Sequence, residues 1–176
     1  RVSDHVYQLD PAESSNYVVI SESGKALAID YGYRGTIGFG ASYPYPRHRR
    51  PILHGIRPLA AELGIDRIDA VLVTHFHDDH LNGIPLLQRL YGTRCYAAEN
   101  FAFMLARPDR FAFPCTWPEP IDVAAMPIDR PFVWEEYEFH LHPVSGHTQF
   151  STLIDFQADG LTFVATGDQY FFQDFE

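Results

Sequence analysis

The sequence predicts a mixed α/β fold, and three observations support this prediction. Short β-branched and aromatic runs bounded by turn residues occur near both ends of the chain and predict strands. In the middle of the chain, such runs alternate with apolar residues at helical spacing. The chain has 176 residues and is 46% hydrophobic, which is enough for one packed core. We therefore expect a single domain over residues 1–176.

The N-terminal part is expected to begin as an antiparallel meander. Residues 6–9 and 17–20 have the composition of short strands, and a Ser- and Gly-containing turn leads into a third strand over residues 25–30. Residues 31–50 are rich in Gly, Pro and Tyr and have neither a helical nor a strand period. They predict a long loop.

Helices and strands are expected to alternate after this loop. Apolar residues over 52–63 predict a helix that ends at Gly64, with Pro58 kinking or splitting it. A β-branched run over residues 68–73 predicts a short, fully buried strand. A helix, a strand and a second helix are then predicted at residues 85–91, 94–97 and 100–106.

The C-terminal part is expected to be mostly strand. Six prolines between residues 107 and 131 predict a connection without regular structure. Residues 137–142 then alternate as a strand, and strands over residues 150–156 and 161–166 are joined through the hairpin sequence Ala158-Asp159-Gly160.

Composition limits the classes of function. The formal net charge of -10 opposes binding to a phosphate backbone, so nucleic acid is not an expected partner. No apolar run approaches the ~20 residues that a membrane helix requires, so no membrane contact is expected. The compartment and the oligomeric state stay open, with the cytoplasm slightly favoured. Cys95 and Cys115 form no Cys-x-x-Cys pair; we expect reduced or buried thiols, with a single bridge as the open alternative.

Five arginines and no acidic residue occur between residues 31 and 60, although acidic residues outnumber basic ones 23 to 13 in the whole chain. If the loop over residues 31–50 lies beside an active site, its arginines would attract an anionic small molecule. A solvated loop that balances acidic residues elsewhere is an equal alternative. The arginines concerned are Arg34, Arg47, Arg49, Arg50 and Arg57.

Three histidines and two aspartates, within residues 75–80, directly follow the predicted buried strand. Protonated imidazoles repel one another and carboxylates need partners, and a divalent metal satisfies both requirements. His75 and His77 are two apart in extended backbone, so their side chains point to the same side and can share one ion. Asp79 and His80 lie where the chain turns towards a helix and suit a second ion. The alternative is a solvated His/Asp-rich turn, which rarely follows a buried strand.

This segment resembles the His-x-His-x-Asp-His motif of the metallo-β-lactamase superfamily. The resemblance holds at His75, His77, Asp79 and His80, whereas Asp78 occupies a variable position. It implies that the two leading histidines bind a first metal and that the last two residues bind a second.

Three further elements are similar to those of the family and follow its order, so that the resemblance spans about residues 17 to 171. A Gly-His-Thr element contains His147, which is implied to complete the ligands of the first metal. A Thr-Gly-Asp element contains Asp168, implied to bridge both metals, and an early Ile-Asp-x-Gly element contains Asp30, implied to hydrogen-bond near the site.

The resemblance also implies a four-layer αββα sandwich with the metal ligands at one edge of its two sheets. The family normally supplies a further histidine and a closing helix beyond the bridging aspartate. Residues 169–176 contain no histidine, so we expect the C-terminal closing elements to be absent from this sequence.

The function implied by the resemblance is metal-dependent hydrolysis. One or two zinc ions, with iron or manganese as alternatives, would activate a hydroxide that attacks an ester, thioester, lactone, lactam or phosphodiester-type small molecule. Asp79 would act as the catalytic proton shuttle if only one metal binds. Two alternatives stay open: an iron-dependent persulfide-type oxidoreductase and a non-catalytic metal-binding domain.

A second His-x-His pair, His140 and His142, falls on one face of the predicted strand over residues 137–142. Spacing alone would allow these histidines to bind a metal. Because the fuller motif already accounts for the first metal, we expect a surface or structural role.

Overall fold

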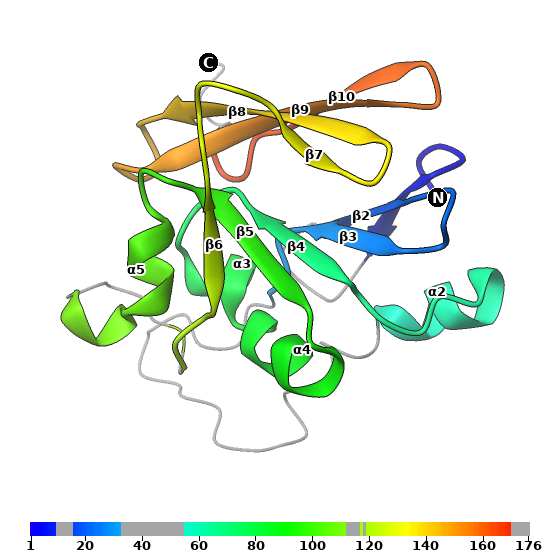
Figure 1. Cartoon of the computed structure of the whole chain (residues 1–176), viewed down its shortest axis with the longest axis horizontal. Coiled ribbons are helices and arrows are strands. Elements are labelled where there is room, and N and C mark those ends of the chain that lie inside the picture. The colour runs from blue at the N-terminus through cyan, green and yellow to red at the C-terminus, as the bar shows by residue number, and fades with distance from the viewer. Residues whose placement is uncertain (10–15, 33–54, 112–116, 118, 170–176) are drawn as a thin grey trace, which may run out of the picture.

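The computed structural model describes residues 1–9, 16–32, 55–111, 117 and 119–169, and it contains two β-sheets that face each other (Figure 1). The first sheet has six strands, in the spatial order β1 (Val6–Leu9), β2 (Asn16–Ile20), β3 (Ala26–Ile29), β4 (Ala70–Val73), β5 (Arg94–Ala98) and β6 (Val123–Met126). The second has four, in the order β10 (Leu161–Ala165), β9 (Ser151–Ala158), β8 (Tyr137–Val144) and β7 (Phe132–Trp134). β1, β2 and β3 pair antiparallel and β3 to β6 pair parallel, whereas the second sheet is antiparallel throughout.

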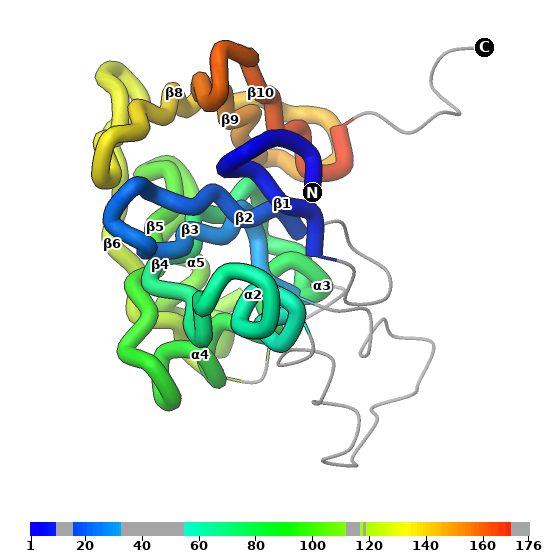
Figure 2. Tube along the Cα trace, turned by 90° about the vertical axis from the view of Figure 1, so that its right-hand side faces the viewer, coloured from blue at the N-terminus to red at the C-terminus, as the bar shows by residue number. Residues whose placement is uncertain are grey.

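The helices lie on the side of the six-stranded sheet that faces away from the other sheet (Figures 1 and 2). The order of layers is therefore helix, sheet, sheet, which confirms the α/β prediction. Among the described residues, no helix covers the outer face of the four-stranded sheet. The helices are α2 (Ile56–Leu63), α3 (Asp78–Leu81), α4 (Ile84–Tyr91), α5 (Ala102–Ala106) and the 3₁₀ helix Pro108–Arg110.

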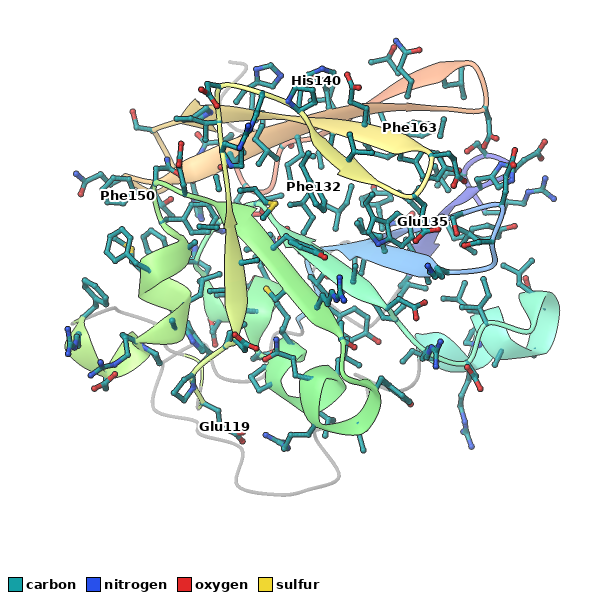
Figure 3. The ribbon with its side chains drawn as sticks, viewed as in Figure 1. Glu119, Phe132, Glu135, His140, Phe150 and Phe163 are labelled. Carbon is teal, nitrogen blue, oxygen red and sulfur yellow. The ribbon has the colours of Figure 1, made fainter. Side chains whose placement is uncertain are left out.

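A large part of the core lies between the two sheets. All residues of β3 and β4 are buried, because these central strands have helices on one face and the second sheet on the other. Phe132 lies on the inner face of the second sheet (Figure 3), and its ring centroid is 4.6 Å from that of Tyr96 on β5. The hydroxyl of Tyr137 donates to the carbonyl of Ile20 at 3.0 Å, which ties the sheets together at one end.

Most predicted elements are confirmed to within two residues at each end. The hairpin between β9 and β10 turns through Asp159 and Gly160, whose φ angles of 54° and 74° are those of a tight primed turn. The carboxylate of Asp159 accepts hydrogen bonds from the backbone N–H and the ring of His5.

One prediction of local structure is wrong. The segment from 107 to 131 contains a strand, β6. Its prolines lie outside Val123–Met126, so every residue of this edge strand keeps a backbone N–H for pairing with β5. The described helix α2 begins at Ile56, so Pro58 stands in its first turn, where a missing N–H costs little, and a kink or split at Pro58 stays a prediction. Residues 52–54 of the predicted helix, and all but Tyr31 and Gly32 of the predicted loop, lie outside the described residues.

Within the described ranges, no helix has the length and apolar character needed to cross a bilayer. Cys95 is a free, buried thiol on β5, and burial raises its pKa above the ordinary range. Cys115 lies outside the described residues.

Candidate metal centre

The predicted metal-binding segment lies at the end of a buried strand. β4 ends at Val73, residues 74–77 form a connection, and α3 begins at Asp78. His77 keeps extended backbone (φ -80°, ψ 147°) directly before the helix. The side chain of His75 is almost wholly buried, with 1% of its surface exposed.

His147 arrives from the β8–β9 connection, about 70 residues further along the chain. Its Nε2 lies 2.8 Å from Nδ1 of His77, and its ring centroid lies 5.1 Å from that of His75. The rings of His75 and His77 are 4.8 Å apart. The structure therefore brings these three predicted residues together at one point.

Thr74 determines which nitrogen of His75 faces the cluster. The Thr74 hydroxyl lies 2.7 Å from Oδ2 of Asp30, and a carboxylate can only accept, so the hydroxyl donates there. Nδ1 of His75, 3.0 Å from the same hydroxyl, must then donate to it. Nε2 of His75 is left with a lone pair, and it is buried without a hydrogen-bond partner in the described part of the chain.

Asp30 orients a second imidazole. Its backbone has φ 58°, a left-handed conformation that Asp tolerates better than most residues, and its side chain is buried. The carboxylate accepts the Thr74 backbone N–H at 2.8 Å and faces Nδ1 of His80 at 2.8 Å. Nε2 of His80 consequently faces two other carboxylates, with Asp168 at 3.3 Å and Asp79 at 3.8 Å. The predicted hydrogen bonding of Asp30 near the site is confirmed.

Asp168 lies between the two groups of residues. One oxygen is 3.3 Å from Nε2 of His80 and the other is 3.5 Å from Nε2 of His147. Gly167 connects it to β10. The φ of Gly167 is 53°, a conformation that favours glycine, and a Cβ there would lie only 2.8 Å from the hydroxyl oxygen of Thr74.

Two sets of candidate ligand atoms share Asp168, and within each set all atoms lie within 4.8 Å of one another. The first set is His75, His77, His147 and Asp168, and the second is Asp79, His80 and Asp168. All six predicted residues therefore belong to one cluster. A buried imidazole nitrogen without a partner, surrounded by three other potential ligands, is what a metal site of this donor type requires.

Electrostatics distinguish the two sets. Burial, together with the fields of His80 and His77, lowers the pKa of His75 to about 2. Burial and the neighbouring His147 also lower the pKa of His77. Burial opposes the positive charge of His80, but the Asp30 carboxylate and hydrogen bonds to Asp168 and Asp30 outweigh it and raise its pKa well above the ordinary value. In the absence of a metal, these shifts favour the neutral imidazole at His75 and His77 and the positively charged imidazolium, with a proton on both ring nitrogens, at His80.

Asp168 is kept ionised at the junction. Burial opposes its charge, but the hydrogen bond from His80 and the fields of His80 and His75 prevail and lower its pKa to about 2. A carboxylate that stays ionised between two groups of imidazoles is suited to bind a cation from both sides.

Three contributors were not predicted. Thr74 fixes the tautomer of His75, and Gly32 permits a close backbone approach, because a Cβ there would lie 2.1 Å from the carbonyl oxygen of Asp79. Gln169 accepts the backbone N–H of His147 at 3.4 Å through its side chain. The Ile-Asp-x-Gly pattern contained a signal for Gly32, but no sequence pattern pointed to Thr74 or Gln169.

Some predicted features lie elsewhere. Residues 33–50 of the arginine-rich segment are outside the described residues, and Arg57 is exposed on α2. His140 and His142 lie on β8, with 45% and 57% of their side chains exposed, and pair with Asp155. A surface position for this second pair is therefore observed.

Curated relatives share part of this sequence. Exodeoxyribonuclease WalJ of Streptococcus pneumoniae serotype 2 is 31% identical over 94 residues, which are 52% of this chain and 28% of that protein. Hydroxyacylglutathione hydrolase of Stenotrophomonas maltophilia is 33% identical over 89 residues, which are 49% of this chain and 27% of that protein. The chain thus matches under a third of the length of these relatives.

Solved structures share the fold. The Rm3 metallo-beta-lactamase superposes with a TM-score of 0.69 at 22% identity, covering 93% of this chain and 59% of that one. MEM-A1, a subclass B3 metallo-beta-lactamase from a soil metagenome library, gives 0.68 at 20% identity, covering 93% and 60%. At such identities the likeness establishes the fold alone.

The family profile described as the metallo-beta-lactamase superfamily matches residues 10–168, which is most of the chain. This range includes the His75 to His80 segment, His147 and Asp168. The chain belongs to the metallo-β-lactamase superfamily.

Proposed function

We propose that this chain is a metal-dependent hydrolase of a small acyl compound, an ester, thioester, lactone or lactam. The observation that carries the proposal is the buried Nε2 of His75, which has no hydrogen-bond partner among the described residues and lies in a cluster with His77, His147 and Asp168. Leaving a buried polar atom unsatisfied costs about 1–3 kcal/mol, and a bound cation removes that cost.

The six clustered side chains would divide between two ions. His75, His77 and His147 would hold the first ion, Asp79 and His80 the second, and Asp168 would contribute one oxygen to each. Zinc suits this mixture of imidazole and carboxylate, and iron or manganese are alternatives. When bound, such ions supply positive charge and lower the pKa of a coordinated water.

The chain's own groups would control orientation and protons. Asp30 and Thr74 hold His80 and His75 with their Nε2 atoms towards the cluster, so the site is preorganised. Asp79, whose side chain is 16% exposed, is in contact with both the cluster and solvent. If only the first ion is bound, Asp79 is free of a metal, and we assign proton transfer to its carboxylate, which would accept a proton from the attacking water and pass it towards the leaving group.

Charge favours an acyl compound over a phosphodiester polymer. One curated relative is named as an exodeoxyribonuclease and another as a hydroxyacylglutathione hydrolase, so the relatives alone do not decide. A net charge of -10 opposes the approach of a polyanion more strongly than that of a small acyl substrate.

The test is a substrate panel with protein of known metal content. The chain is stripped with a chelator, reloaded separately with zinc, manganese or iron, and its metals are counted. Ester, glutathione thioester, lactone, β-lactam and phosphodiester substrates are then assayed. We expect hydrolysis of an acyl substrate, and a kcat about 10²–10⁴-fold lower for Asp79→Asn. His5→Gln, which changes an exposed histidine paired with Asp159, is the matched control and should keep full activity.

Other results would contradict the proposal in distinct ways. Hydrolysis of the phosphodiester alone would move the chain to the nuclease class. Oxidation of a persulfide by protein carrying one iron would make it an oxidoreductase. Two bound ions without turnover of any compound would indicate a non-catalytic metal-binding domain.

A further inference from the structure

A second group of imidazoles and carboxylates lies on the outer face of the four-stranded sheet. His140 and His142 are two apart on β8, so both side chains leave the same face. Asp155 on β9 is the direct cross-strand partner of His140. Figure 3 shows His140 on the side of this sheet that faces away from the core.

The contacts join these side chains through one carboxylate. Oδ1 of Asp155 lies 3.2 Å from Nδ1 of His140, and its Oδ2 pairs with Nε2 of His142. The other ring nitrogen of His140, Nε2, lies 3.2 Å from Oε1 of Glu138. In the described part of the chain, these two carboxylates form ion pairs with the two imidazoles and with no lysine or arginine.

We propose that His140, His142 and Asp155 form a surface binding site for a divalent transition metal such as Zn²⁺, Cu²⁺ or Ni²⁺. Nδ1 of His140 and Nε2 of His142 each lie against an oxygen of the same Asp155 carboxylate, which places the three donors next to one another on the strand pair. Two imidazoles and one carboxylate are a donor set that such ions accept, with water in the remaining positions.

Glu138 supplies a further reason for a metal at this point. A histidine that binds a metal usually donates its other N–H to a carboxylate, which fixes the ring and its tautomer. With Nδ1 directed to the ion, the Nε2–H of His140 donates to Glu138. Surface ion pairs of histidine contribute little to stability, so stability alone does not account for four such groups on two strands.

The site differs from the buried centre in rigidity. The ring centroids of His140 and His142 are 6.5 Å apart, against 4.8 Å for His75 and His77, so the exposed rings must rotate towards each other when an ion binds. Ordering of exposed side chains opposes binding, so we expect this site to bind an ion with lower affinity than the buried centre does. This inference does not depend on the proposed hydrolase activity.

The test counts ions at two independent places. The metal-stripped chain is titrated with Zn²⁺ and the bound ions are counted after dialysis, for the unaltered chain, for H140A/H142A and for His147→Ala. H140A/H142A should lose one weakly bound ion per chain and keep the ions of the buried centre. His147→Ala should keep the outer ion. Asp155→Asn, which preserves size, should lower the affinity of the His140, His142 and Asp155 site for Zn²⁺ at least tenfold. The exposed Gln157→Ala on the same strand is the matched control.

Cu²⁺ provides a spectroscopic check on the ligands. Paramagnetic resonance of the outer ion should show coupling to two imidazole nitrogens in the unaltered chain and to one in His142→Ala. Equal Zn²⁺ counts for the unaltered chain and H140A/H142A, or equal loss in Gln157→Ala, would overturn the site. Circular dichroism and thermal unfolding of each variant would show that it is folded, and a Cu²⁺ signal without two-nitrogen coupling would also count against the assignment.

Discussion

The chain contains two His-x-His pairs, one directly after a strand and one on a strand, and they occupy opposite environments. His75 and His77 follow β4 in the interior, where burial lowers the pKa of both. His140 and His142 lie on exposed β8, where their rings pair with the Asp155 carboxylate. The spacing of the two pairs is identical, so spacing alone does not distinguish the candidate metal centre from the exposed pair.

The difference lies in what surrounds each pair. The buried pair has His147 and Asp168 brought to it from distant strands, and Thr74 fixes the tautomer of His75. The exposed pair has one shared carboxylate and an orienting Glu138, with solvent on the open side. A buried, preorganised cluster binds a metal without reorganisation, whereas an exposed one must order its side chains first.

The largest effect should come from removing a residue that converges on the buried pair. We expect His147→Ala to lose one bound ion and to lower kcat/KM roughly 100-fold or more, because removing a ligand exceeds the 10–100-fold loss from changing a ligand's partner. Metal counting and hydrolysis of the best acyl substrate measure this. Unchanged metal content would place His147 outside the centre.

A smaller effect should come from the residue that orients His80. Asp30→Asn keeps the shape and tolerates the left-handed backbone at φ 58°, but its neutral side chain holds His80 less firmly. We expect affinity for the second ion to fall about 10–100-fold, with the first ion retained. Competition with a metal-sensitive dye measures both affinities, and a selective loss of the first ion would be the contrary result.

Acidity should separate the two halves of the buried centre. The pKa of His75 is lowered, so protons do not compete for its Nε2 near neutral pH, whereas the pKa of His80 is raised and its Nε2 must lose a proton to bind an ion. As pH falls between about 8 and 5, the second ion should therefore leave first. Dialysis at stepped pH followed by metal counting tests this. Simultaneous loss of both ions would contradict the distinction.

The smallest effect should come from Thr74→Val, which removes one hydroxyl and keeps the side-chain shape. Nδ1 of His75 and one oxygen of Asp30 then lose a buried partner, at a cost of about 1–3 kcal/mol of folding free energy. For a domain of this size, each kcal/mol lowers Tm by about 2–4 °C. Calorimetry of metal-free protein measures the shift, and Thr162→Val on exposed β10 is the matched control.

Local chemistry in the sequence accounted for much of this centre. The residues from His75 to His80 were recognisable because few segments place three imidazoles and two carboxylates after a buried strand. The convergence of His147 and Asp168 could not be derived from periodicity and was expected only from resemblance. The tautomer of His75 depends on a hydroxyl and a carboxylate 44 residues apart, which no local pattern reveals.

The fold, like the metal centre, was predictable where a local sequence pattern indicated it and not where contacts between distant segments determine it. Central strands such as β4 are apolar throughout because both faces are covered, and this is visible in the sequence. β6 was not predicted because its own composition does not indicate a strand. It forms a strand through parallel pairing with β5, in which Cys95 is opposite Val123. Flanking prolines then made the segment look irregular.

The most direct measurement is the position of bound zinc by anomalous X-ray diffraction from crystals of zinc-loaded protein. Our account predicts an ion at about 2.0–2.1 Å from Nε2 of His75, with nitrogens of His77 and His147 also bound to it. A zinc-saturated crystal with no ion in contact with His75 would contradict the account.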